Sequence, residues 1–153
     1  MAKHKLIVTA GLLLALVMLY WLWPGRYAME AMPSLAEPFQ ATLQLAPGES
    51  TVLNLPYEYD TLLVVPPYTP TKSLQSLHLS WKLTRQVSAN FTHHESYHFY
   101  VIKDGDLQGY ALLQADFSTT NSGADLVRID APAQLEVTHQ PNRHRPLEIG
   151  PAS

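Results

Sequence analysis

The sequence predicts an α+β fold in which an N-terminal transmembrane helix precedes a small, mainly antiparallel β-sheet domain with one covering helix. Three observations lead to this fold class. An uncharged apolar run fills residues 6–23, short β-type runs separated by turn residues follow, and the segment after Thr69-Pro70 has helical spacing. Strands in succession with a single convincing helix are typical of α+β domains. A pure β-sandwich is the alternative fold.

The first element is a membrane anchor at residues 6–23. This run of 18 uncharged residues would be about 27 Å long as a helix, close to the thickness of a bilayer core. Lys3 and Lys5 precede it, so the positive-inside rule assigns residues 1–5 to the cytoplasm. The residues after the anchor then lie on the outer side of the inner (cytoplasmic) membrane. A cleaved signal peptide is the alternative, but the run is long for one and no small-x-small cleavage site follows it.

The next segment, residues 24–38, contains three prolines and is expected to be a linker that lets the domain stand off the membrane. The domain should then occupy residues 39–139. Its first element is a predicted β-hairpin, because apolar residues alternate from Phe39 to Leu45, Pro47-Gly48 supplies a turn, and a second apolar run ends at Leu55.

The run from Thr61 to Val65 is apolar and rich in β-branched residues, which indicates a central strand covered on both faces. Thr69-Pro70 then offers an N-cap residue and a proline at the first helical position, and Leu74 and Leu77 recur at helical spacing. We therefore expect a helix of about ten residues there.

A second hairpin is predicted where the runs Tyr97–Lys103 and Leu107–Leu113 flank the turn Asp104-Gly105-Asp106. Shorter strands are expected at Leu126–Ile129 and Leu135–Val137.

The last segment, residues 140–153, has three prolines and almost no apolar pattern, so we expect it to be disordered.

Residues 60–69 (DTLLVVPPYT) join an Asp, a hydrophobic strand and Pro-Tyr-Thr ahead of a helix, and residues 99–105 (FYVIKDG) supply a later hairpin. In these two segments the chain resembles small membrane-anchored or lipoprotein-like bacterial envelope proteins of unassigned function. The resemblance covers under a third of the domain, and the chain departs from the lipidated members because it has no cysteine. It implies an architecture and no reaction.

Composition excludes several function classes. From Met32 onward there are seven Lys or Arg against twelve Asp or Glu, a net charge of −5, which opposes binding to nucleic acid. The absence of cysteine excludes disulfides, thiolate metal sites and cysteine nucleophiles. No nucleotide-binding or serine-hydrolase motif is present, so we expect no cofactor, and a non-enzymatic module is the leading interpretation.

One motif points to chemistry. Residues 94–98 (HESYH) match H-E-x-x-H, in which His94 and His98 would bind zinc and Glu95 would activate water, provided that the segment is helical. The apolar run that follows instead predicts that His98 begins a strand, where residues four apart stand about 13 Å from each other. We therefore interpret the match as a chance occurrence in a histidine-rich loop. A zinc-dependent metallohydrolase is the alternative function, and its third ligand would come from Asp116, Glu136 or His139. Adventitious or structural metal binding by His93, His94 and His98 is a further interpretation.

The function expected from these observations is a membrane-anchored binding or interaction module on the extracytoplasmic side, either an envelope accessory protein or an immunity-type protein. Its partner would be an envelope protein or peptide. Tyr57, Tyr59, Pro67 and Tyr68 are the candidate contact residues, because tyrosines and rigid prolines supply contact area at low entropic cost.

Overall fold

The computed structural model describes residues 2–91, 95–113, 117–119, 126–131, 134–141 and 147–152, without the side chains of residues 2–7, 24, 117–119 and 151. The helices are α1 (Ala2–Leu22), η1 (Pro24–Tyr27), α2 (Pro33–Ala41), η2 (Thr42–Gln44), η3 (Thr71–Leu77) and α3 (Trp81–Asn90), the η elements being 3₁₀ helices. The strands are β1 (Ser50–Leu53), β2 (Thr61–Val65), β3 (Tyr97–Lys103), β4 (Asp106–Leu113), β5 (Phe117–Thr119), β6 (Val127–Asp130), β7 (Leu135–His139) and β8 (Leu147–Pro151).

The strands form two four-stranded sheets, in the orders β4-β3-β2-β6 and β1-β7-β8-β5. All neighbours are antiparallel except the β5–β8 pair, which is parallel. The α+β class and the mainly antiparallel pairing are therefore confirmed, whereas the single sheet was wrong. Two sheets do enclose a common core, as in the β-sandwich alternative, but helices cover part of both cores.

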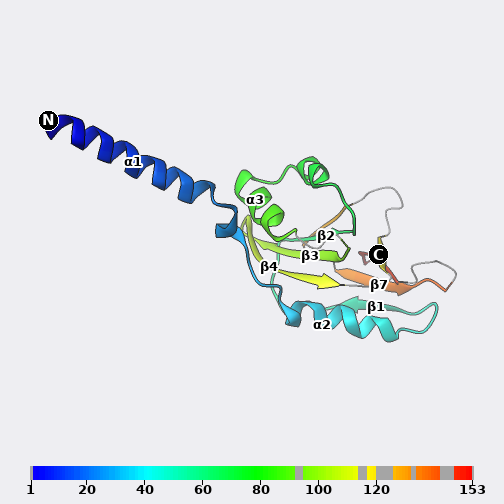
Figure 1. Cartoon of the computed structure of the whole chain (residues 1–153). Coiled ribbons are helices and arrows are strands. Elements are labelled where there is room, and N and C mark those ends of the chain that lie inside the picture. Colours follow the sequence, from blue (N-terminus) through cyan, green and yellow to red (C-terminus); the bar gives the residue numbers. More distant parts are fainter. Residues whose placement is uncertain are drawn as a thin grey trace.

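The β4-β3-β2-β6 sheet is the middle of three layers (Figure 1). One of its faces shares a hydrophobic core, here the first core, with the second sheet and α2. The other face is covered by η3 and α3 and forms the second core with them. Within β2, Leu62 and Val64 enter the first core, while Leu63 and Val65 enter the second. This two-sided burial explains the continuous apolar run, and the predicted central strand is confirmed.

The β3–β4 hairpin and the later strands are also confirmed. The turn between β3 and β4 has positive φ at both Asp104 (52°) and Gly105 (75°), the conformation that Asp-Gly favours in a two-residue hairpin loop. Strands β6 and β7 fall on the two short runs predicted for them.

The first predicted hairpin is wrong in its first strand, because α2 and η2 occupy residues 33–44. Leu35, Phe39 and Thr42 recur at helical spacing and are buried, whereas Leu43 of the alternating pattern is exposed. The ring of Phe39 packs 4.1 Å from that of Phe99, centroid to centroid. The helical period therefore determines which side chains enter the core.

Both predicted borders of the domain also need correction. Leu35 and Ala36 are part of the first core, so residues 24–38 are not a free linker and the domain begins before Phe39. At the other end, Leu147 and Ile149 of β8 pair with β7 and are buried, so this part of the supposedly disordered tail is a strand. The short alternation of apolar residues in β8 suffices for a strand, because β7 provides a neighbouring strand for it to pair with.

The helix expected after Thr69-Pro70 is a 3₁₀ helix, η3, which ends at His78 in the left-handed conformation (φ 51°). The α-helix of this layer starts later, at Trp81. There Ser80 is the N-cap and its Oγ accepts a hydrogen bond from the backbone N–H of Leu83 (3.2 Å).

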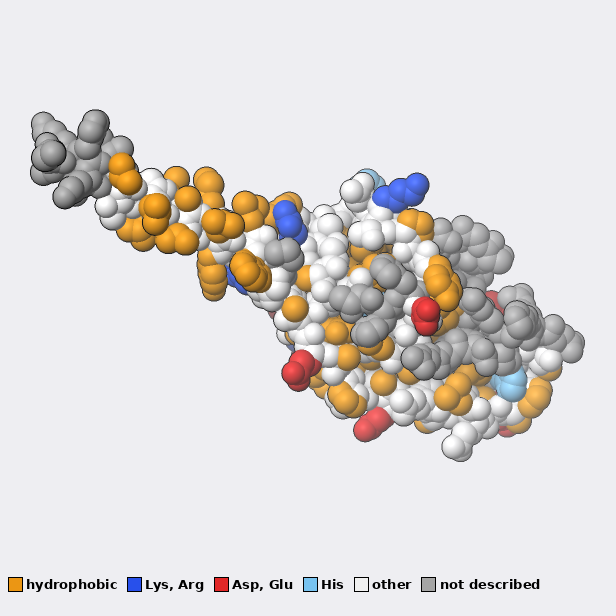
Figure 2. Space-filling view, viewed as in Figure 1, with side chains coloured by type: hydrophobic (Ala, Val, Ile, Leu, Met, Phe, Trp, Pro, Cys, Tyr) orange, Lys and Arg blue, Asp and Glu red, His pale blue; other side chains and the backbone are white. Residues whose placement is uncertain are grey.

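Helix α1 projects from one end of the domain, and hydrophobic side chains surround it (Figures 1 and 2). In the described part of the chain, no helix combines the length and the hydropathy that crossing a membrane requires.

Candidate functional site

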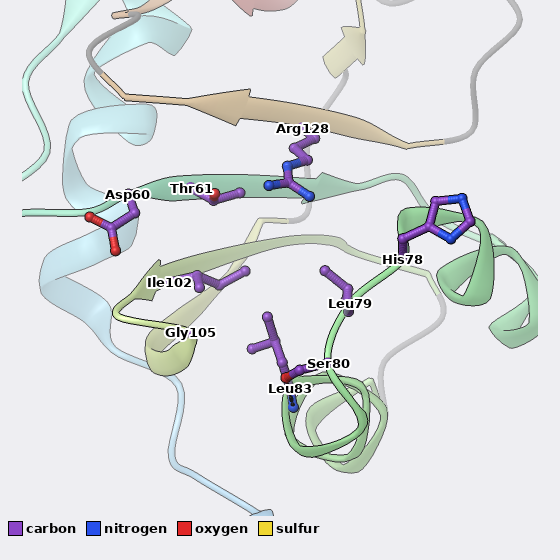
Figure 3. A pocket seen from close by; sticks show the side chains of 9 residues that line it. All are labelled: Asp60, Thr61, His78, Leu79, Ser80, Leu83, Ile102, Gly105 and Arg128. Atoms are coloured by element: carbon purple, nitrogen blue, oxygen red, sulfur yellow. Dashed lines mark hydrogen bonds between the residues drawn. The ribbon is translucent and has the colours of Figure 1, made fainter.

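A cavity of about 250 Å³ opens between the middle sheet and the η3–α3 layer (Figure 3). Four segments that are far apart in the sequence meet there: the start of β2, the η3–α3 connection, the end of β3 with its turn, and β6. The cavity is lined by Asp60, Thr61, His78, Leu79, Ser80, Leu83, Ile102, Gly105 and Arg128.

The inner wall of the cavity is apolar. Leu83 comes from α3, Ile102 from β3 and Leu79 from the connection before α3, and their side chains converge on the same space (Figure 3). Leu83 and Ile102 are buried, whereas Leu79 is half-buried. A wall of this kind gains free energy when it contacts another apolar group, because both lose contact with water.

Arg128 brings a positive charge to the rim. It stands on β6, and its Nε donates hydrogen bonds to both carboxylate oxygens of Asp130, at 2.9 and 3.2 Å. Thr61 Oγ1 also donates to Asp130 Oδ1, at 2.6 Å. These interactions, with Thr61 contributing most, hold the pKa of Asp130 below its usual value of 3.8. Asp130 therefore orients the arginine while the end of the guanidinium stays at the cavity (Figure 3).

Asp60, the acidic residue of the rim, has a structural task. Its Oδ2 accepts a hydrogen bond from the backbone N–H of Asp104 (2.6 Å), which holds the β3–β4 turn beside the start of β2. Its own backbone N–H donates to Ile102 O, and its carbonyl accepts from Ala131 N, both at 2.8 Å. The carboxylate of Asp60 is thus committed to the turn.

His78 and Ser80 form the edge on the helical side. His78 is exposed and ends η3, while Ser80 caps α3 and already accepts a hydrogen bond from a backbone N–H. The arrangement therefore offers an apolar wall, one oriented cation and hydrogen-bonding groups, which suits binding.

The described part of the H-E-x-x-H segment, residues 95–98, does not form the helix that a zinc site of this type requires. His94 and His93 lie outside the described residues. Glu95 is exposed in a turn, and His98 lies on β3 as predicted. The His98 ring is fully buried, stacks on Tyr100 (5.8 Å between centroids) and packs against Phe91 (4.8 Å). These contacts are those of a core side chain.

The proposed further ligands do not join it. Glu136 and His139 lie on β7 in the other sheet, and His139 Nδ1 is 2.6 Å from the carbonyl oxygen of Leu45. Asp116 lies outside the described residues. Among the described side chains, no group of three or more His, Asp or Glu is arranged to hold a metal ion.

The four candidate contact residues do not form one ledge. Tyr57 and Tyr59 precede β2 and pack on the first core, and the hydroxyl of Tyr57 lies 2.8 Å from Ser34 Oγ. Pro67 and Tyr68 follow β2, so about 16 Å of strand separates the two pairs. Tyr68 alone is strongly exposed (70%), at a positive φ of 61°.

Comparison of the chain with protein-family models, with curated proteins and with solved structures finds no match.

Proposed function

We propose that this chain is a membrane-tethered binding module. Residues 6–23 would anchor it in the inner membrane with residues 1–5 in the cytoplasm, and the two-sheet domain would bind an envelope protein or peptide on the extracytoplasmic side. The observation that carries the proposal is the exposure of α1. The large apolar side chains from Val8 to Trp23 are each between 51% and 66% exposed.

These side chains point in all directions around α1. Leu12, Leu13 and Leu14, which are successive residues about 100° apart around the axis, are all exposed. A helix that is apolar on every face requires an apolar environment on every face, which a single neighbouring protein surface does not supply and lipid does. The two lysines before the run and the aromatic residues at its end agree with the proposed orientation.

The cavity supports a protein or peptide partner. At about 250 Å³ it lies below the range of roughly 300–1,000 Å³ that is usual for small-molecule pockets, so it suits one protruding side chain better than a whole metabolite. Its apolar wall would take an aliphatic or aromatic side chain, with Arg128 beside it for an acidic neighbour. An accessory subunit of an envelope complex and an immunity-type protein would both fit this description.

A photo-crosslinking amino acid at position 79, in the full chain in its own membranes, tests the proposal. We expect one dominant adduct, whose partner is then identified by mass spectrometry, and we expect Arg128→Gln to reduce its yield severalfold. The control is the same probe at position 43. Leu43 is more exposed (53%) than the half-buried Leu79, but it lies on η2, on the opposite side of the middle sheet. Equal adducts from both positions, or a chain that stays uncrosslinked, would contradict the proposal.

A further inference from the structure

Arg26 stands where α1 ends, and three aromatic rings surround its guanidinium group. The central carbon of this group lies 4.6 Å from the ring centroid of Trp21, 5.1 Å from that of Tyr20 and 5.8 Å from that of Tyr27. All three distances lie within the range of cation–π attraction. Three rings around one exposed arginine hold its position far more firmly than the side chain alone would.

The turn that carries Arg26 is itself fixed. Pro24 starts η1, and the backbone N–H of Arg26 donates to Trp23 O (3.2 Å). The indole of Trp23 covers Gly25 so closely that a Cβ there would meet its Nε1 at 2.7 Å. A residue with a side chain at position 25 would displace the indole.

The domain holds the other end of this turn through Asn90 of α3. The Nδ2 of Asn90 donates to Tyr27 O (2.9 Å), and its Oδ1 accepts from Met29 N (2.7 Å). Asn90 is buried. Asn90 therefore ties the segment that directly follows Arg26 to α3.

No described residue balances the charge of Arg26. Among the described residues, the cations that form ion pairs are Lys82, Lys103 and Arg128, and no described carboxylate forms an ion pair with Arg26. A cation–π contact attracts the charge of the guanidinium group without giving its N–H groups an oxygen acceptor, so the five N–H donors of this group can still bind acceptors. Phosphate oxygens match this planar fork, often through two parallel hydrogen bonds.

We propose that Arg26 and its three aromatic rings bind the phosphodiester of a membrane phospholipid. The inference rests on the proposed membrane tether, because it requires the end of α1 to lie at the headgroup layer. The position agrees with this, since Arg26 follows the apolar run by three residues and tyrosine and tryptophan rings favour that layer. Anionic phospholipids should be preferred, because their headgroups add attraction for a cation.

Solid-state NMR of the full chain tests this site. The chain, with ¹³C-labelled guanidinium carbons, is reconstituted in phosphate-free buffer in vesicles of phosphatidylethanolamine and phosphatidylglycerol. Dephasing of the arginine signal by ³¹P reports a guanidinium group in contact with lipid phosphate. We expect dephasing in the wild type, its loss in Arg26→Lys, and its retention in the control Arg128→Lys, whose parent side chain pairs with Asp130.

Two further arms separate the possible failures. In maltoside micelles with inorganic phosphate as the only phosphorus, we expect no dephasing, and dephasing there would overturn the assignment to lipid. Extraction of the membranes with alkaline carbonate tests the tether itself. If the chain stays in the membrane but Arg26→Lys keeps the full dephasing, this inference alone is wrong. If carbonate releases the wild-type chain, the proposed function fails as well.

Discussion

Tyr100 and Tyr110 are directly paired across β3 and β4, with their ring centroids 5.9 Å apart, yet their hydroxyl groups have different surroundings. The Tyr100 hydroxyl is buried in the second core and has no hydrogen-bond partner among the described residues. The Tyr110 hydroxyl donates to Met29 O at 3.3 Å, and its backbone carbonyl accepts from Met32 N at 2.8 Å. The buried hydroxyl of Tyr100 thus lowers the stability of the fold, whereas Tyr110 connects the start of the domain to the middle sheet.

We expect the two Tyr→Phe substitutions to act in opposite directions. Tyr100→Phe removes a buried hydroxyl without a described partner and should raise the free energy of unfolding by about 1 kcal/mol. Tyr110→Phe removes a weak hydrogen bond and should lower it by about 0.5 kcal/mol. Urea unfolding of the full chain in detergent micelles measures both. A loss of more than about 1 kcal/mol in Tyr100→Phe would mean that its hydroxyl has a partner after all.

Burial, and then the nearby Tyr110, raise the pKa of Tyr100 far above its usual value of 10. In the unfolded chain this hydroxyl ionises near pH 10, while in the folded chain it stays neutral. Folding stability is therefore lost as the pH rises above about 10, and Tyr100→Phe should reduce that loss.

Asp130 gives the opposite pH dependence. Its pKa is lowered by hydrogen bonds from Thr61 and Arg128, so its contribution to stability is present above the unfolded pKa of about 4 and is lost as the pH falls through the lower folded value. We expect Asp130→Asn to flatten the decline of the unfolding midpoint below pH 4. If the unfolding midpoint of this variant declines below pH 4 as in the wild type, the interactions of Asp130 with Thr61 and Arg128 do not contribute to the acid dependence of stability.

At the scale of elements, Asn90 links α3 to the chain segment that leaves α1. Its side-chain amide uses its oxygen and both of its N–H groups, because Nδ2 also donates to Gln86 O (2.7 Å) besides Tyr27 O. The segment expected to be a flexible linker is therefore held against the domain at Tyr27 and Met29. The pattern of prolines gave no sign of this, since an asparagine 61 residues beyond Met29 provides the contact.

Asn90→Ala should lower the free energy of unfolding by about 2 kcal/mol, because it removes three partly buried hydrogen bonds of which each contributes about 0.5–1.5 kcal/mol. Hydrogen exchange of the Met29 amide should accelerate at the same time. Ser88→Ala, two residues earlier on α3, is the control and should leave that amide protected. Unchanged Met29 exchange in Asn90→Ala would mean that the segment is held by other contacts.

An element can be predicted from the sequence when its own residues determine it. This holds for β2 and β3, because a strand covered on both faces must be apolar at nearly every position. For α2 two periods compete, and the helical one places Leu35 and Phe39 in the core, where Phe39 meets Phe99. Strand β8 depends on β7 as its neighbour, which no local pattern reveals.

The cavity escaped prediction for a related reason. Its residues come from four segments, and each residue has an ordinary local explanation. Arg128 alternates outward on a strand, and Ser80 caps a helix. The capping serine followed by Leu83 and Val87 at helical spacing was a usable signal for the start of α3, but it says nothing about what faces that helix. By contrast, the strand at His98 was predictable, because an apolar run and a turn follow it directly.

At the scale of the whole molecule, an apolar helix projects from a three-layer domain (Figures 1 and 2). Asn90 links the turn after α1 to the same helix whose first turn lines the cavity. In the proposed function, a partner would meet the cavity above the membrane. The tether is therefore the central claim on which the partner and the lipid site depend.

Protease protection of a tag placed after Ser153 tests this claim most directly. In intact spheroplasts, protease added from outside should remove the tag, while a cytoplasmic marker protein stays whole and the tagged chain sediments with the membranes. A tag that is degraded only after lysis, or a chain recovered in the soluble fraction, would contradict the proposed tether.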